Sequence, residues 1–226
     1  MRIPLTKYGW PQVVIFPVAI ITIMVISPLA GLPFRPVITI EITLAIILVW
    51  GLSFFRDPHR AVPQDSNLLL APADGKITDI ETVENDFIGG EALRIGIFLS
   101  IFDAHINRAP CDVKVEKIIY KKGRYKNAVN PESGRVNESN DLNLVRTDQP
   151  RDKLIVRQIS GAIARRIVCG AAEGQKLAGG EKFGMIKFGS RTELYLTIRE
   201  NAKTLVQIGD EVKAGLTPLV RYENKK

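Results

Sequence analysis

The chain has 226 residues, with 31 Lys and Arg, 24 Asp and Glu, and a formal net charge of +7. Its length supports one sizeable domain with an appendage, and a hydrophobic share of 46% excludes a wholly disordered chain. Cys111 and Cys169 have no C-x-x-C spacing and no nearby histidine, which excludes a disulfide scaffold and argues against a zinc site. The positive charge favours an anionic partner, either nucleic acid or an acidic membrane surface.

Hydrophobic residues are concentrated in the first quarter of the chain. Residues 8–34 carry no charge, and the second apolar run, 36–55, contains only Glu41. A bilayer core needs about 20 apolar residues as helix, so we predict a transmembrane hairpin with helices at about 12–32 and 37–55. The alternatives are a cleaved signal peptide and buried core helices. The length of the first run, and the second run directly after it, favour the hairpin.

Basic residues flank this hairpin, whereas its connecting loop contains only Arg35; the flanking residues are Arg2, Lys7, Arg56 and Arg60. The positive-inside rule therefore predicts that both ends lie on the cytoplasmic side of the cell (inner) membrane. Residues 1–60 are expected to form the hairpin and a linker, and residues 61–226 a cytoplasmic domain.

The rest of the chain is predicted to be mainly β, because short β-type runs alternate with turn residues. In the last run Leu194 and Leu196 alternate with Tyr195 and Thr197, which is typical of a half-buried strand. One short helix is expected at 103–107, and the polar, Asn-rich stretch 120–150 is expected to be a mobile loop over the site. The predicted strands are 75–80, 93–101, 113–120, 153–159, 163–169, 183–188 and 193–199.

Three glycine-containing segments, 71–77, 173–180 and 207–215, have the hairpin spacing of biotinyl and lipoyl domains. Their glycines supply turns with positive φ between short strands. The predicted fold is therefore a flattened β-barrel or sandwich with lipoyl-like hairpins.

Two places could carry chemistry. His105 follows an apolar strand, whereas the other histidine, His59, lies in the membrane-proximal linker. Gly189-Ser190 ends the run 183–190, and a serine hydroxyl activated by a neighbouring base can attack the carbonyl that precedes it. A strand turn and a structural histidine are the plainer interpretations of the same residues.

Taken together, the motifs are similar to those of the phosphatidylserine decarboxylase family, in its short membrane-anchored form. Their order and spacing match over roughly residues 50–200. The matching pieces are Phe55-Arg56-Asp57-Pro58, Ala71-Pro72-Ala73-Asp74-Gly75, the stretch 102–110 around His105, and Phe188-Gly189-Ser190.

The resemblance implies a proenzyme that cleaves itself between Gly189 and Ser190 into a β chain, 1–189, and an α chain, 190–226, which remain together as a heterodimer. Ser190 becomes a pyruvoyl group, the cofactor, which forms a Schiff base with the serine headgroup and accepts electrons as CO₂ leaves. The implied substrate is phosphatidylserine in a membrane, and the product is phosphatidylethanolamine.

The resemblance also implies roles for individual residues. Asp74 would orient His105, and His105 would take the proton of Ser190. Asn107, Arg108 and Phe188 are further candidates for substrate binding, and no metal is expected.

The chain departs from the family pattern at two places. Longer members have H-x-x-H where this chain has His105 and Arg108, which leaves open whether one histidine does the work of both. Their Asn-Glu-Arg-Asn loop is altered here to Asn137-Glu138-Ser139-Asn140, which puts substrate contacts from that loop in doubt.

Three other functions compete with this one. A membrane-anchored lipoyl-like adaptor without catalytic activity would share the hairpin and turns, and Lys187 resembles a modification lysine at a hairpin tip. A pyruvoyl decarboxylase for another substrate would share the processing site, although the hairpin argues against a soluble substrate. A nucleic-acid binder is disfavoured because the positive charge is scattered.

Overall fold

A computed structural model describes residues 5–130, 132–162, 166–187 and 190–223 of the chain. The chain divides into two compact units, Met1–Pro58 and His59–Lys226. The boundary between the two units lies between Pro58 and His59.

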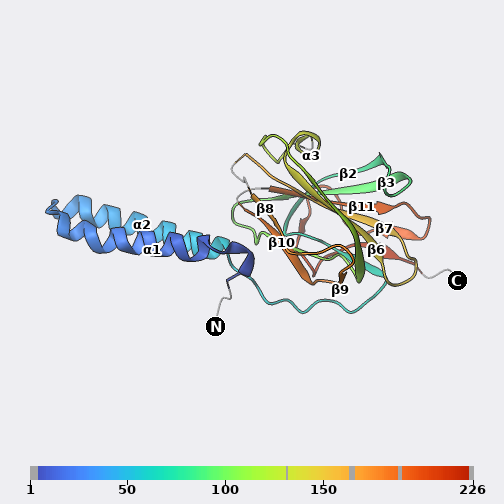
Figure 1. The fold of residues 1–226 in the computed structure, drawn as a ribbon, viewed down its shortest axis with the longest axis horizontal. Helices are drawn as coiled ribbons and strands as arrows, with labels where there is room; N and C mark the ends of the chain where they lie inside the picture. Colours follow the sequence, from blue (N-terminus) through green and yellow to red (C-terminus); the bar gives the residue numbers. More distant parts are fainter. Residues whose placement is uncertain (1–4, 131, 163–165, 188–189, 224–226) are drawn as a thin grey trace. The chain divides into compact units, whose positions relative to one another are not determined.

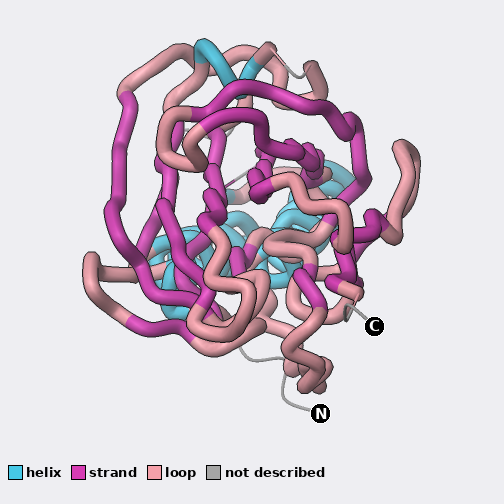
Figure 2. The backbone as a smooth tube through the Cα atoms, turned by 90° about the vertical axis from the view of Figure 1, so that its right-hand side faces the viewer, coloured by secondary structure: helices cyan, strands magenta, loops and turns pink. Residues whose placement is uncertain are grey.

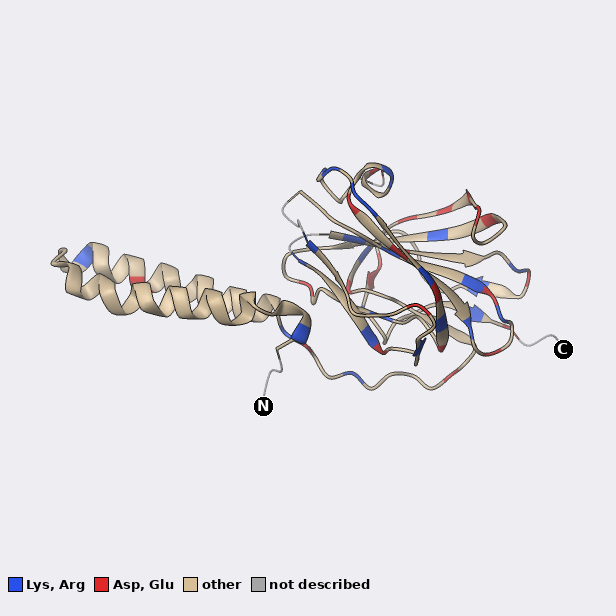
Figure 3. Ribbon diagram, in the orientation of Figure 1, with Lys and Arg blue, Asp and Glu red and all other residues tan. Residues whose placement is uncertain are grey.

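The first unit contains two apolar helices, α1 (Gln12–Ile26) and α2 (Phe34–Phe54), beside the short 3-10 turns η1 (Lys7–Gly9) and η2 (Ser27–Ala30). The stretches Gln12–Ala30 and Phe34–Phe54, of 19 and 21 residues, are long and apolar enough to cross a membrane. Charged side chains are almost absent from them (Figure 3). The Ser27 hydroxyl donates a hydrogen bond to the Glu41 carboxylate, so the acidic residue of α2 has a polar partner within the hairpin.

The second unit is mainly β, which confirms the predicted class. Its largest described sheet is antiparallel, has the strand order β13-β2-β3-β11-β7-β6-β5-β9 and curls into a half-barrel (Figures 1 and 2). The strands are β2 (Gly75–Asn85), β3 (Gly90–Leu99), β5 (Val113–Lys121), β6 (Ser139–Arg146), β7 (Lys153–Ile159), β9 (Lys176–Leu177), β11 (Ser190–Thr197) and β13 (Glu211–Val212).

Two smaller sheets complete the described part of this unit, with the orders β4-β10-β8 and β1-β14-β12. Their strands are β1 (Leu68–Leu70), β4 (Ile106–Arg108), β8 (Arg166–Cys169), β10 (Lys182–Lys187), β12 (Ala202–Thr204) and β14 (Pro218–Tyr222). β10 and β11 follow each other in the chain but belong to different sheets. The segment 188–189 therefore connects two sheets.

Alternate apolar side chains of the large sheet form the core. Ile95 and Ile97 of β3, Leu142 of β6, and Leu194 and Leu196 of β11 are all buried in one cluster. Burial of each such side chain stabilises the fold by about 1.5–3 kcal/mol. β11 lies between β3 and β7, so the residues directly after 188–189 belong to an inner strand of the sheet.

Three local predictions are wrong. Within the stretch 120–150, predicted as a loop, residues Ser139–Arg146 form β6, which pairs with β5 and β7. Residues 103–107 form a turn and the start of β4; the short described helix is α3 (Ser133–Val136). β11 is buried on both faces along nearly its whole length rather than half-buried, because its second face carries charged side chains that pair with one another.

Candidate active site

Ser190 is the first residue of β11 and its side chain is wholly buried. It pairs with Leu99, the last residue of β3. Its hydroxyl has no hydrogen-bond partner among the described residues. A buried hydroxyl is normally hydrogen-bonded; the buried hydroxyls of Ser133 and Ser160 also lack a described partner, and Ser190 differs from them in standing directly after the predicted cleavage site. Gly189, the other residue of the predicted cleavage site, and Phe188, a candidate for substrate binding, lie outside the described residues.

His105 is also wholly buried, directly before β4. Its Nδ1 lies 2.9 Å from the carbonyl oxygen of Asp103. A carbonyl only accepts hydrogen bonds, so we infer that the neutral ring carries its proton on Nδ1. Nε2 then carries the lone pair that a general base needs.

Backbone contacts connect the segment that contains His105 to residues on both sides of 188–189. Leu99 pairs with Ser190 on one side of the segment 188–189, and the His105 carbonyl accepts a hydrogen bond of 3.2 Å from the amide of Ile186 on the other side. A turn closed by Asp103, whose carboxylate accepts hydrogen bonds from both the amide and the hydroxyl of Ser100, joins these two contacts. Residues 99–105 therefore contact the chain at Ile186, before the predicted cleavage site, and at Ser190.

Asp74 has different partners from those the resemblance implies. Its carboxylate accepts two hydrogen bonds of 2.6 Å from the guanidinium of Arg60 and one of 2.8 Å from the Ala214 amide. These are its hydrogen bonds among the described residues, so the expected direct bond to His105 is not among them. Arg60, which sequence analysis used only to orient the hairpin, is therefore a missed partner of this carboxylate.

Asp74 is nevertheless connected to His105 through the backbone. The carbonyl of Pro72, two residues before Asp74, accepts a hydrogen bond of 3.0 Å from the amide of Arg108 in β4. β4 begins at the residue after His105. A shift of the Asp74 loop would therefore be transmitted to the strand that carries the imidazole.

Asn107 and Arg108 have separate surroundings. The Asn107 side chain donates to the Thr192 hydroxyl at 3.0 Å and accepts from the Gln158 amide at 2.9 Å. Gln158 in turn accepts from Asn140 at 3.0 Å. Thr192 lies two residues after Ser190 and so on the same face of β11, which places this uncharged hydrogen-bond chain beside the serine.

Arg108 points elsewhere. Its guanidinium donates to the Gly180 carbonyl at 3.0 Å, and its stem packs against Gly215. The altered family loop is equally fixed: the Asn137 side chain hydrogen-bonds the backbone of Lys126 and of Ser160.

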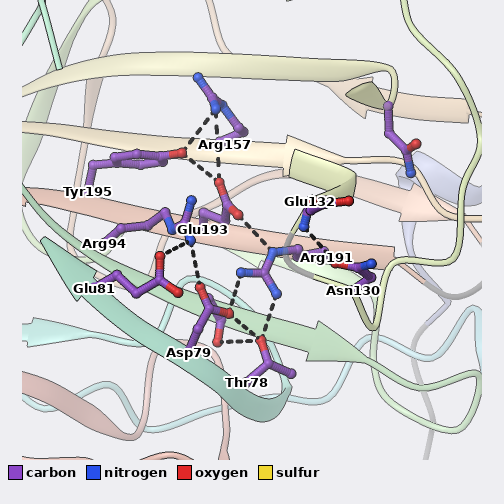
Figure 4. A network of polar contacts seen from close by, with 12 residues as sticks. Thr78, Asp79, Glu81, Arg94, Asn130, Glu132, Arg157, Arg191, Glu193 and Tyr195 are labelled. Atoms are coloured by element: carbon purple, nitrogen blue, oxygen red, sulfur yellow. Dashed lines mark hydrogen bonds and ion pairs between the residues drawn. The ribbon is translucent and has the colours of Figure 1, made fainter. Parts of the chain in front are cut away.

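The opposite face of β11 carries a buried ionic network (Figure 4). Arg191 and Glu193 are both fully buried there, and Arg191 also pairs with Asp79 of β2. Burial raises the pKa of Asp79, but the hydrogen bond and charge of Arg191 outweigh this, and the net pKa is lowered. Arg157 joins the network by donating to Tyr195 at 3.0 Å. Alternation along the strand indicates the positions of these residues but not their partners.

Lys187, the last residue of β10, is buried and lies opposite Arg166 of β8. Desolvation, and then the charge of Arg166, lower the pKa of Lys187. A lysine that receives a lipoyl or biotinyl group must be reached by a modifying enzyme, so a buried lysine disfavours the adaptor interpretation.

The described residues contain no cluster of His, Cys, Asp or Glu that could hold a metal ion. The two cysteines are not bonded to each other, and burial raises the pKa of Cys111 to about 12. Cys111 is therefore a thiol rather than a nucleophile at neutral pH.

Comparison with known proteins gives a consistent family match. Residues 49–219 match the family model described as phosphatidylserine decarboxylase. A phosphatidylserine decarboxylase proenzyme of Rhodopirellula baltica is 38% identical over 98% of this chain and 89% of its own length. A protein of the same name from Nitrosomonas europaea is 38% identical over 96% and 95%, and one from Desulfotalea psychrophila 45% identical over 74% and 77%.

Proposed function

The chain belongs to the phosphatidylserine decarboxylase family, and from that premise we propose that it cleaves itself between Gly189 and Ser190 to make its own cofactor. Its activity is the decarboxylation of phosphatidylserine, with phosphatidylethanolamine and CO₂ as products. The observation that carries the proposed cleavage site is the buried, unpaired hydroxyl of Ser190 at the junction between two sheets.

In the proposed processing reaction, Ser190 Oγ attacks the carbonyl carbon of Gly189. Nε2 of His105 takes the hydroxyl proton and returns it to the Ser190 nitrogen as the C–N bond breaks, which leaves an ester. Loss of the Ser190 Cα proton then expels the Gly189 carboxylate by β-elimination. The dehydroalanine at position 190 takes up one water and releases ammonia, which leaves a pyruvoyl group at the start of the α chain.

The surroundings of Ser190 fit a pyruvoyl group. That group supplies an electron sink for the pair of electrons left behind when CO₂ departs. The pyruvoyl carbonyl would take the place of a hydroxyl that has no described partner, so no described hydrogen bond is lost. The nearby Asn107–Gln158 chain is uncharged, which avoids stabilising the substrate carboxylate that must be lost.

We assign His105 as the general base of processing, acting through Nε2. Asp74 positions it indirectly, because its contacts with Arg60 and Ala214 fix the loop that supports β4. Asn107, Arg108 and Phe188 remain candidates for headgroup binding. Of these, Asn107 has the better-supported position, beside Thr192 on the serine face of β11.

The two apolar helices would anchor the enzyme in the membrane that holds its lipid substrate. The basic flanks of the hairpin favour a cytoplasmic catalytic domain at the inner membrane. After cleavage, the β and α chains would stay together as a heterodimer, because β11 pairs on both sides with strands of the β chain.

Intact mass of the full chain under denaturing conditions tests the cleavage site. The wild-type protein should separate into chains 1–189 and 190–226, the second with a pyruvoyl end. Ser190→Ala should remain one chain without decarboxylase activity, because alanine has no nucleophile. Ser66→Ala makes the same change at an exposed serine, serves as the matched control and should still cleave. Two polypeptides from Ser190→Ala would refute the assignment.

A further inference from the structure

Cleavage before Ser190 would create a new chain end inside the protein. Ser190 pairs with β3 at Leu99, whereas pairing with β7 begins only at Arg191, opposite Ile159. Ends of strands open more readily than their middles. The residue that would carry the reactive carbonyl is therefore paired with one neighbouring strand only. How exactly its carbonyl is positioned depends on the residue that follows it.

That next residue, Arg191, has a fully buried side chain anchored at three points (Figure 4). Nε donates to Glu193 at 2.8 Å, Nη1 donates to the Thr78 hydroxyl at 2.6 Å, and Nη2 pairs with Asp79. Side chains alternate along a strand, so this anchor lies on the face of β11 opposite Ser190. It leaves the reacting face free.

Strand β3, which lies between β2 and β11, leaves room for the Arg191 guanidinium to reach β2. Thr78 and Asp79 belong to β2, and β3 separates β2 from β11. A Cβ on Gly96 of β3 would lie 1.9 Å from Arg191 Nη2, so only glycine leaves room there. The register of β2 against β3 shifts between Ile77 and Asp79, a bulge that turns Thr78 toward the same place.

The ion pair between Arg191 and Asp79 also stabilises this anchor. Asp79 keeps its negative charge, because Arg191 lowers its pKa despite burial. A guanidinium that donates hydrogen bonds to several acceptors has far less freedom to move than a side chain held by a single hydrogen bond. Arg191 thus ties the start of β11 to β2, two strands away.

We propose that Arg191 is a positioning residue for decarboxylation: its buried anchor fixes the new end of the α chain so that the pyruvoyl carbonyl stays in place after cleavage. This inference rests on the proposed cleavage at Gly189–Ser190. Before cleavage the peptide bond to Gly189 already restrains Ser190, so the anchor matters most in the mature enzyme. A misplacement of about 1 Å at a reacting centre can cost roughly 100-fold in rate.

The test compares Arg191→Gln with Arg157→Gln in the full membrane-bound chain. Arg157 belongs to the same buried network: it bonds Asp141 and Tyr195 and lies 4.0 Å from Glu193, but it makes none of the three contacts that anchor Arg191. Cleavage is followed by intact mass over time, the pyruvoyl carbonyl is counted with a hydrazine reagent, and kcat and KM are measured with phosphatidylserine in detergent micelles. Hydrogen exchange of the first residues of the α chain gives a readout independent of activity.

For Arg191→Gln we expect complete cleavage and a full count of carbonyls, a kcat lowered about 10- to 100-fold with KM changed less than about threefold, and faster exchange at the start of β11. Arg157→Gln should keep kcat within about threefold. Arg191→Lys keeps the positive charge but loses the forked guanidinium, so its kcat should lie between those of Arg191→Gln and the wild type. If Arg191→Gln does not fold, the kcat of Arg191→Lys alone tests the proposal.

Three results would overturn the proposal. Arg191→Gln or Arg191→Lys with wild-type kcat would show that the anchor does not position the carbonyl, and a loss of cleavage itself would assign Arg191 to processing instead. An equal loss of kcat in Arg157→Gln would show a general effect of the network. Failure of the wild-type chain to cleave at Gly189–Ser190 would refute the proposed function, which is a separate outcome.

Discussion

At the scale of single residues, His105 combines complete burial with a defined hydrogen bond from one ring nitrogen. Because Nδ1 is engaged by the Asp103 carbonyl, the other nitrogen is the one that can accept a serine proton. The same backbone that fixes His105 also ends at Leu99, the partner of Ser190. The candidate base and the strand partner of the candidate nucleophile thus belong to one short segment, 99–105.

We therefore expect His105→Ala to slow self-cleavage about 10²- to 10⁴-fold, the usual cost of losing a general base. Cleavage happens once per molecule, so a time course by intact mass is needed rather than an endpoint gel. His59→Ala is the matched control and should cleave at the normal rate. Asp74→Asn should slow the reaction less, because Asp74 acts through the backbone. If His105→Ala cleaved at the normal rate and Arg108→Ala did not cleave, the role of base would belong to position 108 instead.

At the scale of secondary structure elements, β11 is unusual because one face packs in the apolar core and the other carries charge. Glu193 is central to the charged face: it accepts hydrogen bonds from Arg191 at 2.8 Å and from the Tyr195 hydroxyl at 2.6 Å. With Glu193 removed, Arg191 would keep only Asp79 as a charged partner among the described residues. Breaking a buried ion pair by removing one partner is strongly destabilising.

Glu193→Gln should lower the free energy of unfolding by about 3–5 kcal/mol. The measurement is urea unfolding in detergent of the uncleaved Ser190→Ala form, so that a single chain is compared throughout. Glu84→Gln makes the same change at an exposed position of β2 and should stay within about 0.5 kcal/mol. Equal midpoints for the two variants would contradict a structural role for the ionic face.

How far these elements could be predicted depends on where their partners lie. The two long helices and seven of the fourteen described strands lie where the sequence predicts them, because apolar runs and alternation are local signals. β6 was missed because Asn140, which looks like a loop residue, is buried against Gln158 of β7. The cleavage site and His105 came from motif resemblance, whereas the partners of Arg60 and Arg191 are distant in sequence and no local pattern names them.

At the scale of the whole molecule, the apolar hairpin and its basic flanks lead to a prediction of where the domain works. We expect the protein to sediment with membranes and its domain to face the cytoplasm. Protease added to sealed spheroplasts should leave the domain intact, whereas lysed spheroplasts, the control, should show digestion. Digestion in the sealed sample would reverse the proposed topology.

A buried thiol and two buried tyrosine hydroxyls of the domain predict that its stability depends on pH. Desolvation raises the pKa of Cys111 to about 12, and it likewise raises the pKa values of Tyr195 and Tyr222. Above about pH 9 the unfolded chain loses these protons while the folded protein keeps them, so stability falls as pH rises. Urea midpoints of the Ser190→Ala form should therefore drop between about pH 8 and about pH 10.5, and Cys111→Ala should show a smaller drop. A constant midpoint would contradict these pKa shifts.

The inner position of β11 has a consequence for the life history of the enzyme. The precursor can fold as one chain, in a process whose rate does not depend on concentration. After the proposed cleavage, the α chain would supply an inner strand to a sheet whose neighbours belong to the β chain, so denatured mature enzyme would have to refold by an encounter between two molecules. Recovery after denaturation should then rise with protein concentration for the mature enzyme but not for Ser190→Ala, which makes maturation a step that the molecule takes only once.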